Sequence, residues 1–388
     1  MNSKELMEAE DKYFINTFTR QPIVLDHGEG IKVYDKEGKE YLDFFAGIAV
    51  NCLGHNHPKL VKAIQEQASK IIHASSIYYN EPAIVFAKRL IDLTGFDRIF
   101  YSNSGAESNE GAIKLALKYT GKSEIITTTH SFHGRTLLTL AATGQEKYRE
   151  PYLKNLPQGF REVPYNDLEA IKEAITDETA AVIIEPIQGE GGVNIPSENF
   201  FKDLSTLLKE KGILLIVDEV QTGFGRCGTL FAHEIHGIKP DIMTLAKGIG
   251  GGVPMGAFLA TEEVATAFEP GDHGTTFGGG PLVCAAANGT LDAILEEDLV
   301  NNSKEVGIYF KDKLLELKDK HDVVVDVRGC GLMIGVELSI PGAEFVDNLR
   351  EKGFLINCTA GNVLRFVPPL IIGKEDVDKI IVALDEVL

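Results

Sequence analysis

The chain has 388 residues, of which 44% are hydrophobic and 24% charged, the composition of a globular protein with about two to three domains. This composition excludes a disordered chain, a collagen and a small disulfide-bonded scaffold. The formal net charge of −19 disfavours nucleic acid and an anionic membrane as main partners, although it does not exclude a local basic pocket.

The N-terminus and the cysteines indicate a cytoplasmic protein. The first residues, MNSKELMEAEDKYF, contain no apolar segment typical of a secretion signal, and no window approaches the ~18 uncharged apolar residues of a membrane span. The five cysteines are scattered and form no C-x-x-C pair, which predicts reduced thiols. The pair His55 and His57 has no third ligand at useful spacing, so we expect no metal site.

The predicted elements alternate between strands and helices along most of the chain. After an N-terminal arm, IKVYDKEGKEYLDFFAG predicts a hairpin, and residues His57–Ile72 have helical periodicity. Further strands are expected at RIFYS, EIITTT, AAVIIE, GILLIV and DIMTLA, with helices at AESNEGAIKLALKY and FFKDLSTLLKEKG. The continuous apolar run Ile213–Val217 is typical of a strand buried on both faces, which predicts a mostly parallel α/β sheet covered by helices.

The pattern changes near residue 281, where a second, smaller α+β unit is expected. The helix PLVCAAANGTLDAILEE leads to a helix around Ser303–Lys320, then to strands at VVVDVRG, GLMIGVEL, FLINC and VLRFVPP and a C-terminal helix. We therefore expect an N-terminal arm and hairpin over residues 1–50 that belong to a small domain, a large domain over 51–280 and a C-terminal small domain over 281–388.

Three predicted strands end on residues that can bind or react with a ligand, and ligands bind beyond the carboxyl ends of such strands. After RIFYS, Ser104 and Glu107 have the S-x-x-E spacing of a capping box, which indicates either a well-capped helix or a seat for a phosphate group. Asp218 closes an apolar strand and needs a cation or a protonated ring nitrogen as partner. Lys247 follows the strand DIMTLA and is either a surface lysine or an amine nucleophile.

The glycine run after Lys247 fits neither the P-loop nor the dinucleotide-binding pattern, which disfavours a kinase or a nucleotide-dependent oxidoreductase. A phosphate seat, a buried acid and a reactive lysine are instead what pyridoxal phosphate requires. Over its whole length the chain resembles the class III (subgroup II) aminotransferases of the type I pyridoxal-phosphate fold. The motifs are SNSGAESNEGAIKLA, SFHGRT, EPIQGEGG, DEVQTGFGR, LAKGIGGGVPMGA, HGTTFGGGPLVCAAA and LRFVPPL.

The resemblance implies roles for the residues around the cofactor, pyridoxal 5'-phosphate. Lys247 would bond to the cofactor and then move a proton as general acid and base, so Lys247 and Asp218 are the expected catalytic residues. Asp218 would keep the ring nitrogen protonated, and Gln221 would bind the ring hydroxyl. The large domain over residues 51–280 would be the cofactor-binding domain.

Further cofactor contacts are implied on both faces of the ring and at the phosphate. Phe132 would stack on one face and Val220 would pack on the other, although core packing is the ordinary role of such side chains. Gly105 and Ala106 would donate backbone N–H groups to the phosphate. Thr276 would reach the phosphate from the other subunit, so the resemblance implies a homodimer with shared active sites.

The resemblance also implies substrate-binding residues. Arg135 and Arg365 would each hold a carboxylate, as the guanidinium fork does well, although both could be surface ion pairs. Glu190 would pair with Arg365 when the amino donor is bound and release it for the keto acid. Thr275 would contact the donor's acetylated end or its carboxylate.

The segment GIAVNCLGHNHP and the compact length favour the members that act on N2-acetyl-L-ornithine, in arginine biosynthesis, with 2-oxoglutarate as acceptor. Ornithine, 4-aminobutyrate and succinyl-diaminopimelate remain alternative donors. Phe18 stands where the ornithine δ-aminotransferases place a tyrosine, so a hydroxyl that would hold a free α-amino end is absent, which favours an acylated donor. A non-catalytic binding module is disfavoured because Lys247, Asp218 and Gln221 are all present.

Overall fold

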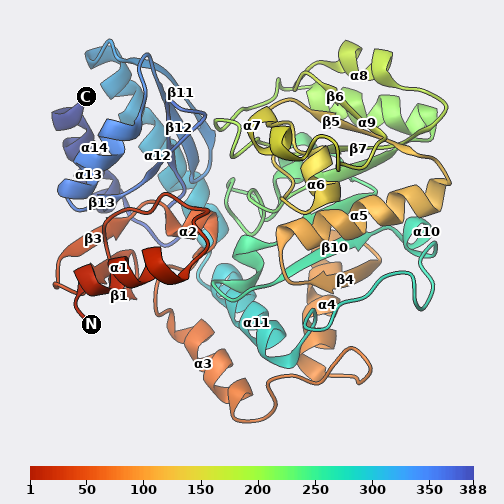
Figure 1. Cartoon of the computed structure of the whole chain (residues 1–388), viewed down its shortest axis with the longest axis horizontal. Helices are drawn as coiled ribbons and strands as arrows, with labels where there is room; N and C mark the ends of the chain where they lie inside the picture. The colour runs from red at the N-terminus through yellow and green to blue at the C-terminus, as the bar shows by residue number, and fades with distance from the viewer.

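The computed structural model describes all 388 residues and arranges the strands in one seven-stranded and two four-stranded sheets (Figure 1). The strand order of the large sheet is β4-β10-β9-β8-β7-β5-β6. Its strands are β4 (Arg98–Ser102), β5 (Glu124–Thr128), β6 (Phe160–Val163), β7 (Thr179–Ile184), β8 (Leu214–Asp218), β9 (Ile242–Leu245) and β10 (Gly256–Ala260). Only β10 runs antiparallel to its neighbours, so the predicted mostly parallel sheet is confirmed.

Helices cover both faces of the large sheet because its central strands alternate their apolar side chains between two cores. Ile183 and Ile216 pack with one helix, α5, whereas Val182 and Val217 pack with α9 on the opposite face. The helices of this part are α3 (Pro58–Ala68), α4 (Glu81–Thr94), α5 (Gly105–Thr120), α6 (Leu137–Ala142), α7 (Glu146–Arg149), η1 (Glu150–Tyr152), α8 (Leu168–Ala174), α9 (Phe200–Lys211), η2 (Ala232–His236), η3 (Lys247–Gly250), α10 (Glu262–Ala265) and α11 (Pro281–Glu296).

The two smaller sheets lie in the half of the molecule that also contains both chain termini (Figure 1). One has the order β1-β2-β3-β13 and the other β11-β12-β15-β14. Their strands are β1 (Leu25–Glu29), β2 (Lys32–Asp35), β3 (Glu40–Asp43), β11 (Val324–Cys330), β12 (Met333–Leu338), β13 (Phe354–Leu355), β14 (Asn357–Thr359) and β15 (Val363–Phe366). The surrounding helices are α1 (Ser3–Tyr13), α2 (Ala46–Ala49), α12 (Leu299–Lys320), α13 (Ala343–Glu351) and α14 (Lys374–Val387).

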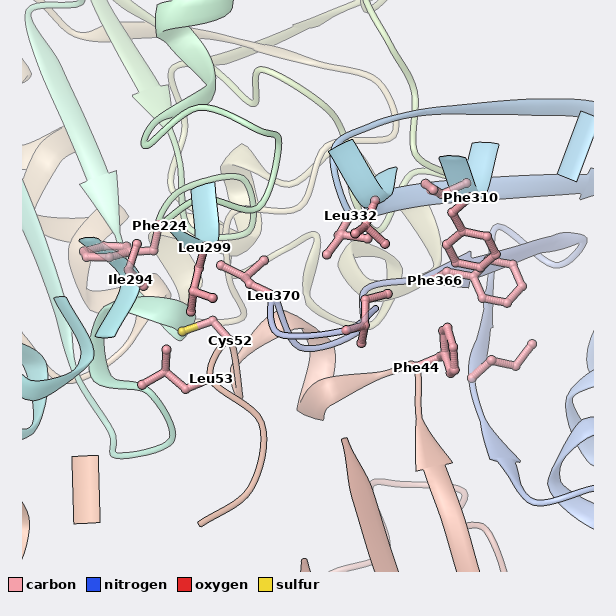
Figure 2. Close-up of a cluster of buried hydrophobic side chains, with 14 of the residues drawn as sticks. Phe44, Cys52, Leu53, Phe224, Ile294, Leu299, Phe310, Leu332, Phe366 and Leu370 are labelled. Carbon is pink, nitrogen blue, oxygen red and sulfur yellow. The ribbon is translucent and has the colours of Figure 1, made fainter. Parts of the chain in front are cut away.

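The N-terminal hairpin joins the C-terminal part of the chain, because β13 pairs in parallel with β3. This pairing supports the division into residues 1–50, 51–280 and 281–388, which stays a prediction. The largest hydrophobic core, of 46 buried residues, continues from Phe44, Phe310 and Phe366 to Leu370 and Phe224 (Figure 2). One apolar core therefore connects the two smaller sheets to the loops that follow the strands of the large sheet.

Most predicted elements are present, with differences at their ends. The helix expected to reach Ile72 ends at Ala68, and the helix expected from Ser303 begins at Leu299. The missed elements include β10, whose sequence GAFLA is short, lacks β-branched residues and follows a glycine-rich stretch. No helix has the length and apolarity needed to cross a membrane.

Candidate active site

A cavity of about 500 Å³ opens where β4, β8 and β9 end. The polar side chains that follow these strands converge there, as expected at the carboxyl edge of a parallel sheet. Eight of the predicted site residues line it: Gly105, Ala106, Phe132, Arg135, Asp218, Val220, Gln221 and Lys247. No group of three or more His, Cys, Asp or Glu side chains is placed to hold a metal ion.

The N-terminus of α5 points its first residues into this cavity. Ser104 accepts a hydrogen bond from the Glu107 N–H at 3.2 Å, as the capping prediction requires. The predicted reciprocal bond is wrong, because the Glu107 carboxylate instead accepts from the backbone N–H and the side-chain amide of Asn103, at 2.8 and 2.7 Å. Asn103 offers two donors to one oxygen, which explains why the carboxylate reaches past Ser104. The N–H groups of the first turn have no intrahelical partner and suit an anion.

Gly105 is required at the start of this helix. A Cβ atom added there would lie 2.8 Å from a methyl carbon of Val220, so a larger residue would force the helix and the loop after β8 apart. Because Gly105 and Val220 both line the cavity, this contact sets the distance between the helix N-terminus and the loop. The narrow gap supports a cradle in which a phosphate meets backbone N–H groups.

Asp218, at the end of β8, is 3% exposed and already has partners within the chain. Its Oδ2 accepts from His133 Nδ1 and Asn109 Nδ2, both at 2.7 Å, and its Oδ1 accepts from the Val220 N–H at 3.0 Å. Sequence reasoning missed His133 and Asn109, although both lie inside quoted motifs, SFHGRT and SNSGAESNEGAIKLA. These bonds hold the carboxylate at the cavity wall, where a protonated ring nitrogen could meet it.

Lys247 directly follows β9 and begins the short helix η3. Its φ angle of 49° lies in the left-handed region, which is uncommon for a residue other than glycine. Burial lowers the pKa of its amine, although the negative charge of Glu190 opposes the shift. A lysine amine with a lowered pKa is the neutral nucleophile that carbonyl chemistry requires.

Glu190 and Arg365 form an ion pair beside the cavity. Arg365, in the middle of β15, is fully buried, and its Nη1 donates to Glu190 Oε1 at 2.5 Å. Gln221 joins the pair, since its Oε1 accepts from Arg365 at 3.0 Å and its Nε2 donates to Glu190 at 3.3 Å. Burial raises the pKa of Glu190, but the charges of Arg365 and Lys247 outweigh burial, so its pKa is lowered.

The same cavity contains a carboxyl group that sequence reasoning missed, Glu185. Burial raises its pKa to about 7. It has no cation as partner and accepts from the backbone N–H groups of Phe132 at 2.9 Å and Gly189 at 3.2 Å. Its position in the motif EPIQGEGG was the available signal. Glu185 therefore connects the loop that carries Phe132 to the loop that carries Glu190.

Arg135 lies at the exposed end of the cavity and forms no ion pair. Its guanidinium carbon stacks 4.2 Å from the centroid of the Tyr148 ring and 5.8 Å from that of Phe132. Stacking orients the fork while leaving its N–H donors free. The alternative of a surface ion pair is therefore wrong for Arg135, and the buried pair of Arg365 is not a surface pair either.

Besides Glu190 and Arg365, which lie beside the cavity, two further predicted site residues do not line it. Thr275 and Thr276 line a neighbouring pocket, and the Thr275 hydroxyl accepts from Asn103 Nδ2 at 3.1 Å. Phe18 is 64% exposed and does not line the cavity. One chain alone therefore brings together the cofactor and carboxylate-binding candidates but not Thr275, Thr276 or Phe18.

Comparisons with known proteins agree with this geometry. The family Aminotransferase class-III matches residues 14–388. An acetylornithine aminotransferase from Methanothermobacter thermautotrophicus is 54% identical, over 100% of this chain and 99% of its own. The crystal structure of acetylornithine aminotransferase from Elizabethkingia anophelis has a TM-score of 0.88 at 36% identity, covering 100% of this chain and 98% of its own. Ornithine aminotransferase from Toxoplasma gondii, with partial occupancy of PLP at its active site, has a TM-score of 0.96 at 32% identity, covering 99% and 93%.

Proposed function

The chain belongs to the class-III aminotransferases, which depend on pyridoxal phosphate, and we propose that it transfers the δ-amino group of N2-acetyl-L-ornithine to 2-oxoglutarate. The products are N-acetyl-glutamate semialdehyde and glutamate, and the reaction is a step of arginine biosynthesis. One observation carries the proposal: the cavity combines Lys247, Asp218 and the N-terminus of α5 with the buried pair of Arg365 and Glu190 close by.

The residues of the cavity fit pyridoxal phosphate. The N–H groups of Gly105 and Ala106 would hold the phosphate, Asp218 would face the ring nitrogen and Gln221 the ring hydroxyl. Phe132 and Val220 would enclose the ring. Bound there, pyridoxal phosphate supplies a carbonyl that condenses with amines and a ring that accepts the electron pair left when a proton leaves the substrate carbon.

Lys247 has two tasks in this proposal. Its amine would hold the carbonyl group of the cofactor, and burial favours the neutral amine by lowering its pKa. With the cofactor bound, Lys247 would also be the base that takes a proton from the substrate carbon and the acid that returns one. Asp218 would face the ring nitrogen, and the hydrogen bonds from His133 and Asn109 hold its carboxylate in place for that contact.

Arg135 and Arg365 would bind the carboxylates of two kinds of substrate, the amino donor and the keto acid acceptor. The donor presents one carboxylate and the acceptor two. Arg135 is free to bind a carboxylate of either, whereas Arg365 is occupied by Glu190. We assign to Glu190 the role of a switch that stays on Arg365 with the donor and leaves it for 2-oxoglutarate. Thr275 is the proposed contact for the donor's acetylated end or its carboxylate.

A second copy of the chain completes the proposed site. Ile77 and Tyr79, between α3 and α4, are 81% and 97% exposed, and Phe277 beside Thr276 is 65% exposed. His73 from the same segment contacts Phe277, with ring centroids 5.4 Å apart. An exposed apolar surface next to Thr276 supports a homodimer in which this threonine reaches the partner's phosphate seat. All five cysteines are free, which supports a reducing cytoplasmic location.

The test is a comparison of kcat/KM for four donors with 2-oxoglutarate as acceptor. We expect N2-acetyl-L-ornithine to exceed ornithine and 4-aminobutyrate by about 10-fold or more, because a pocket built for an acylated nitrogen leaves a free ammonium unpaired. Succinyl-diaminopimelate serves as a second acylated donor. A higher kcat/KM for ornithine would favour the activity of the Toxoplasma gondii relative instead.

A further inference from the structure

The short helix α2 is a single left-handed turn. The φ angles of Ala46, Gly47, Ile48 and Ala49 are 48°, 62°, 65° and 62°. Only glycine adopts this region freely, because the Cβ atom of other residues approaches the following carbonyl oxygen. Three non-glycine residues in one turn, one of them β-branched, are a strained arrangement that persists only where its surroundings hold it.

The Asp43 side chain holds the start of this turn, and the His55 side chain in turn holds Asp43. Asp43 is 4% exposed, and its Oδ1 accepts from the N–H groups of Phe45 at 3.0 Å and Ala46 at 2.7 Å. Its Oδ2 lies 2.8 Å from His55 Nε2. His55 is itself fixed, since its N–H and C=O both pair with Gly30. The carboxylate therefore binds the start of the turn and the histidine that follows it.

The turn lies beside the lysine. α2 packs against η3, which begins at Lys247. Cys52, just beyond the turn, donates from Sγ to the Gly248 carbonyl at 3.5 Å, and Val50 lines the same cavity as Lys247. If the turn relaxed toward an ordinary conformation, Val50 and Cys52 would shift, and the support of η3 would shift with them.

We propose that Asp43 and His55 are positioning residues for amino transfer, which act by keeping α2 left-handed and thereby fixing the Lys247 turn and the Val50 wall. Neither side chain lines the cavity. The inference rests on the proposed transamination at Lys247. It also gives a role to His55, which the sequence pattern offered only as part of an incomplete metal cluster.

The first experiment compares kcat/KM of holoenzyme variants. We expect His55→Ala to lower kcat/KM about 10–100-fold for donor and acceptor alike, because Lys247 serves both halves of the reaction and small displacements of a catalytic group are costly. His55→Gln, which keeps a donor near the Nε2 position, should recover to within about 3-fold of wild type. The matched control is His321→Ala, since His321 also pairs with a carboxylate, Asp385 at 2.6 Å, but far from α2.

The second experiment tests the strain itself. A glycine at position 49 no longer needs to be held left-handed, so adding Ala49→Gly to His55→Ala should restore at least about a third of the lost activity. Alone, Ala49→Gly should leave the thermal midpoint unchanged or higher. Ala116→Gly, at an equally buried but right-handed helical position, should lower it by about 2–4 °C.

Each outcome decides the proposal. Equal kcat/KM for His55→Ala and His321→Ala would overturn the positioning role, as would a loss confined to one substrate. Parallel falls in thermal midpoint for Ala49→Gly and Ala116→Gly would overturn the strained turn. A wild-type chain without transaminase activity would instead contradict the proposed function, while the thermal midpoints would still test the turn.

Discussion

Two adjacent buried carboxylates have nearly the same hydrogen-bond partners: Asp218, the last residue of β8, and Glu219, which follows it. They are 3% and 1% exposed, and each bonds to a histidine Nδ1: His133 at 2.7 Å and His233 at 3.0 Å. Only Asp218 lines the cavity. Pairing with a histidine therefore does not distinguish a site residue from a structural one.

The two carboxylates differ in the hydrogen-bond donors that they have besides the histidine side chain. Glu219 also accepts from the Thr222 hydroxyl and from the N–H groups of Ala232 and His233, so both of its oxygens are bound by the loop that follows it. Asp218 leaves Oδ1 with one donor, the Val220 N–H. A fully satisfied carboxylate stabilises the loop, whereas a partly satisfied one at a cavity wall can accept a ligand.

Two buried arginines repeat this contrast. Arg365 has a carboxylate partner, Glu190, and lies next to the cavity. Arg226 has none, and donates to the carbonyl oxygens of Leu332 and Pro368, which connects the loop after β8 to the small sheets. Burial lowers the pKa of Arg226 to about 10. Only the arginine next to the cavity is therefore paired with a carboxylate, which is the pairing that the proposed exchange requires.

The largest expected effect is a loss of turnover, without a loss of stability, when a residue that lines the cavity is replaced. Lys247→Ala should abolish turnover, because no other amine lines the cavity to bond the cofactor and move the proton. The thermal midpoint of the protein without cofactor should stay within about 2 °C of wild type. Turnover and visible absorption are the measurements, and retention of both would remove Lys247 from the reaction.

Substitution of the two neighbouring carboxylates should change different properties: kcat for Asp218 and the free energy of unfolding for Glu219. Asp218→Asn should lower kcat by about 10²–10³-fold, because the charge facing the ring nitrogen is lost, and should destabilise the fold less than Glu219→Gln, because Asp218 has three donors and Glu219 has four. Glu219→Gln should destabilise the fold by about 3–5 kcal/mol, because its amide NH₂ would face the donors of the loop. Steady-state rates and urea unfolding measure both variants. Similar losses of kcat in Asp218→Asn and Glu219→Gln would contradict the assignment of Asp218 to the site and of Glu219 to the fold.

For the arginines we expect a smaller contrast. Arg365→Lys should raise KM for 2-oxoglutarate about 10-fold or more with less effect on the monocarboxylate donor, because an ammonium cannot bind a carboxylate through a fork. Arg226→Lys should lower the urea midpoint and leave the ratio of the two KM values near that of wild type. Equal changes in both KM values for Arg365→Lys would argue against the proposed exchange with Glu190.

The smallest expected effect concerns pH. Burial raises the folded-state pKa of Glu185 to about 7 from 4.5, so between these values the folded chain binds a proton that the unfolded chain releases. The free energy of unfolding contributed by Glu185 is therefore full below pH 4.5 and is lost as the pH rises through 7, by about 1–3 kcal/mol. Glu185→Gln should remove this slope in urea unfolding of the protein without cofactor at pH 5 and 7.5. An unchanged slope would show that Glu185 is ionised throughout.

The sequence predicted five of the seven strands of the large sheet, all but β6 and β10, because the apolar runs of those five are short, continuous and bounded by turns, as in Ile213–Val217. It also predicted Asp218 and Lys247, since polar residues at strand ends share one edge of a sheet. Partners such as His133, Asn109 and Glu185 could not be predicted, because their roles depend on contacts between segments far apart in the chain. The left-handed turn over Ala46–Ala49 contradicts local propensity and is visible only in the folded chain.

The antiparallel strand β10 has a consequence for how the protein is made. β4, which leads into the phosphate seat, pairs only with β10, from Ser102 opposite Gly256 to Arg98 opposite Ala260. During synthesis at ~5–20 residues per second, β4 is therefore made about 8–30 s before its partner strand exists. In that interval it is an open edge that can pair with another nascent chain, and the cofactor has nowhere to bind. Pyridoxal phosphate can therefore stabilise the finished protein but cannot assist the folding of an incomplete one.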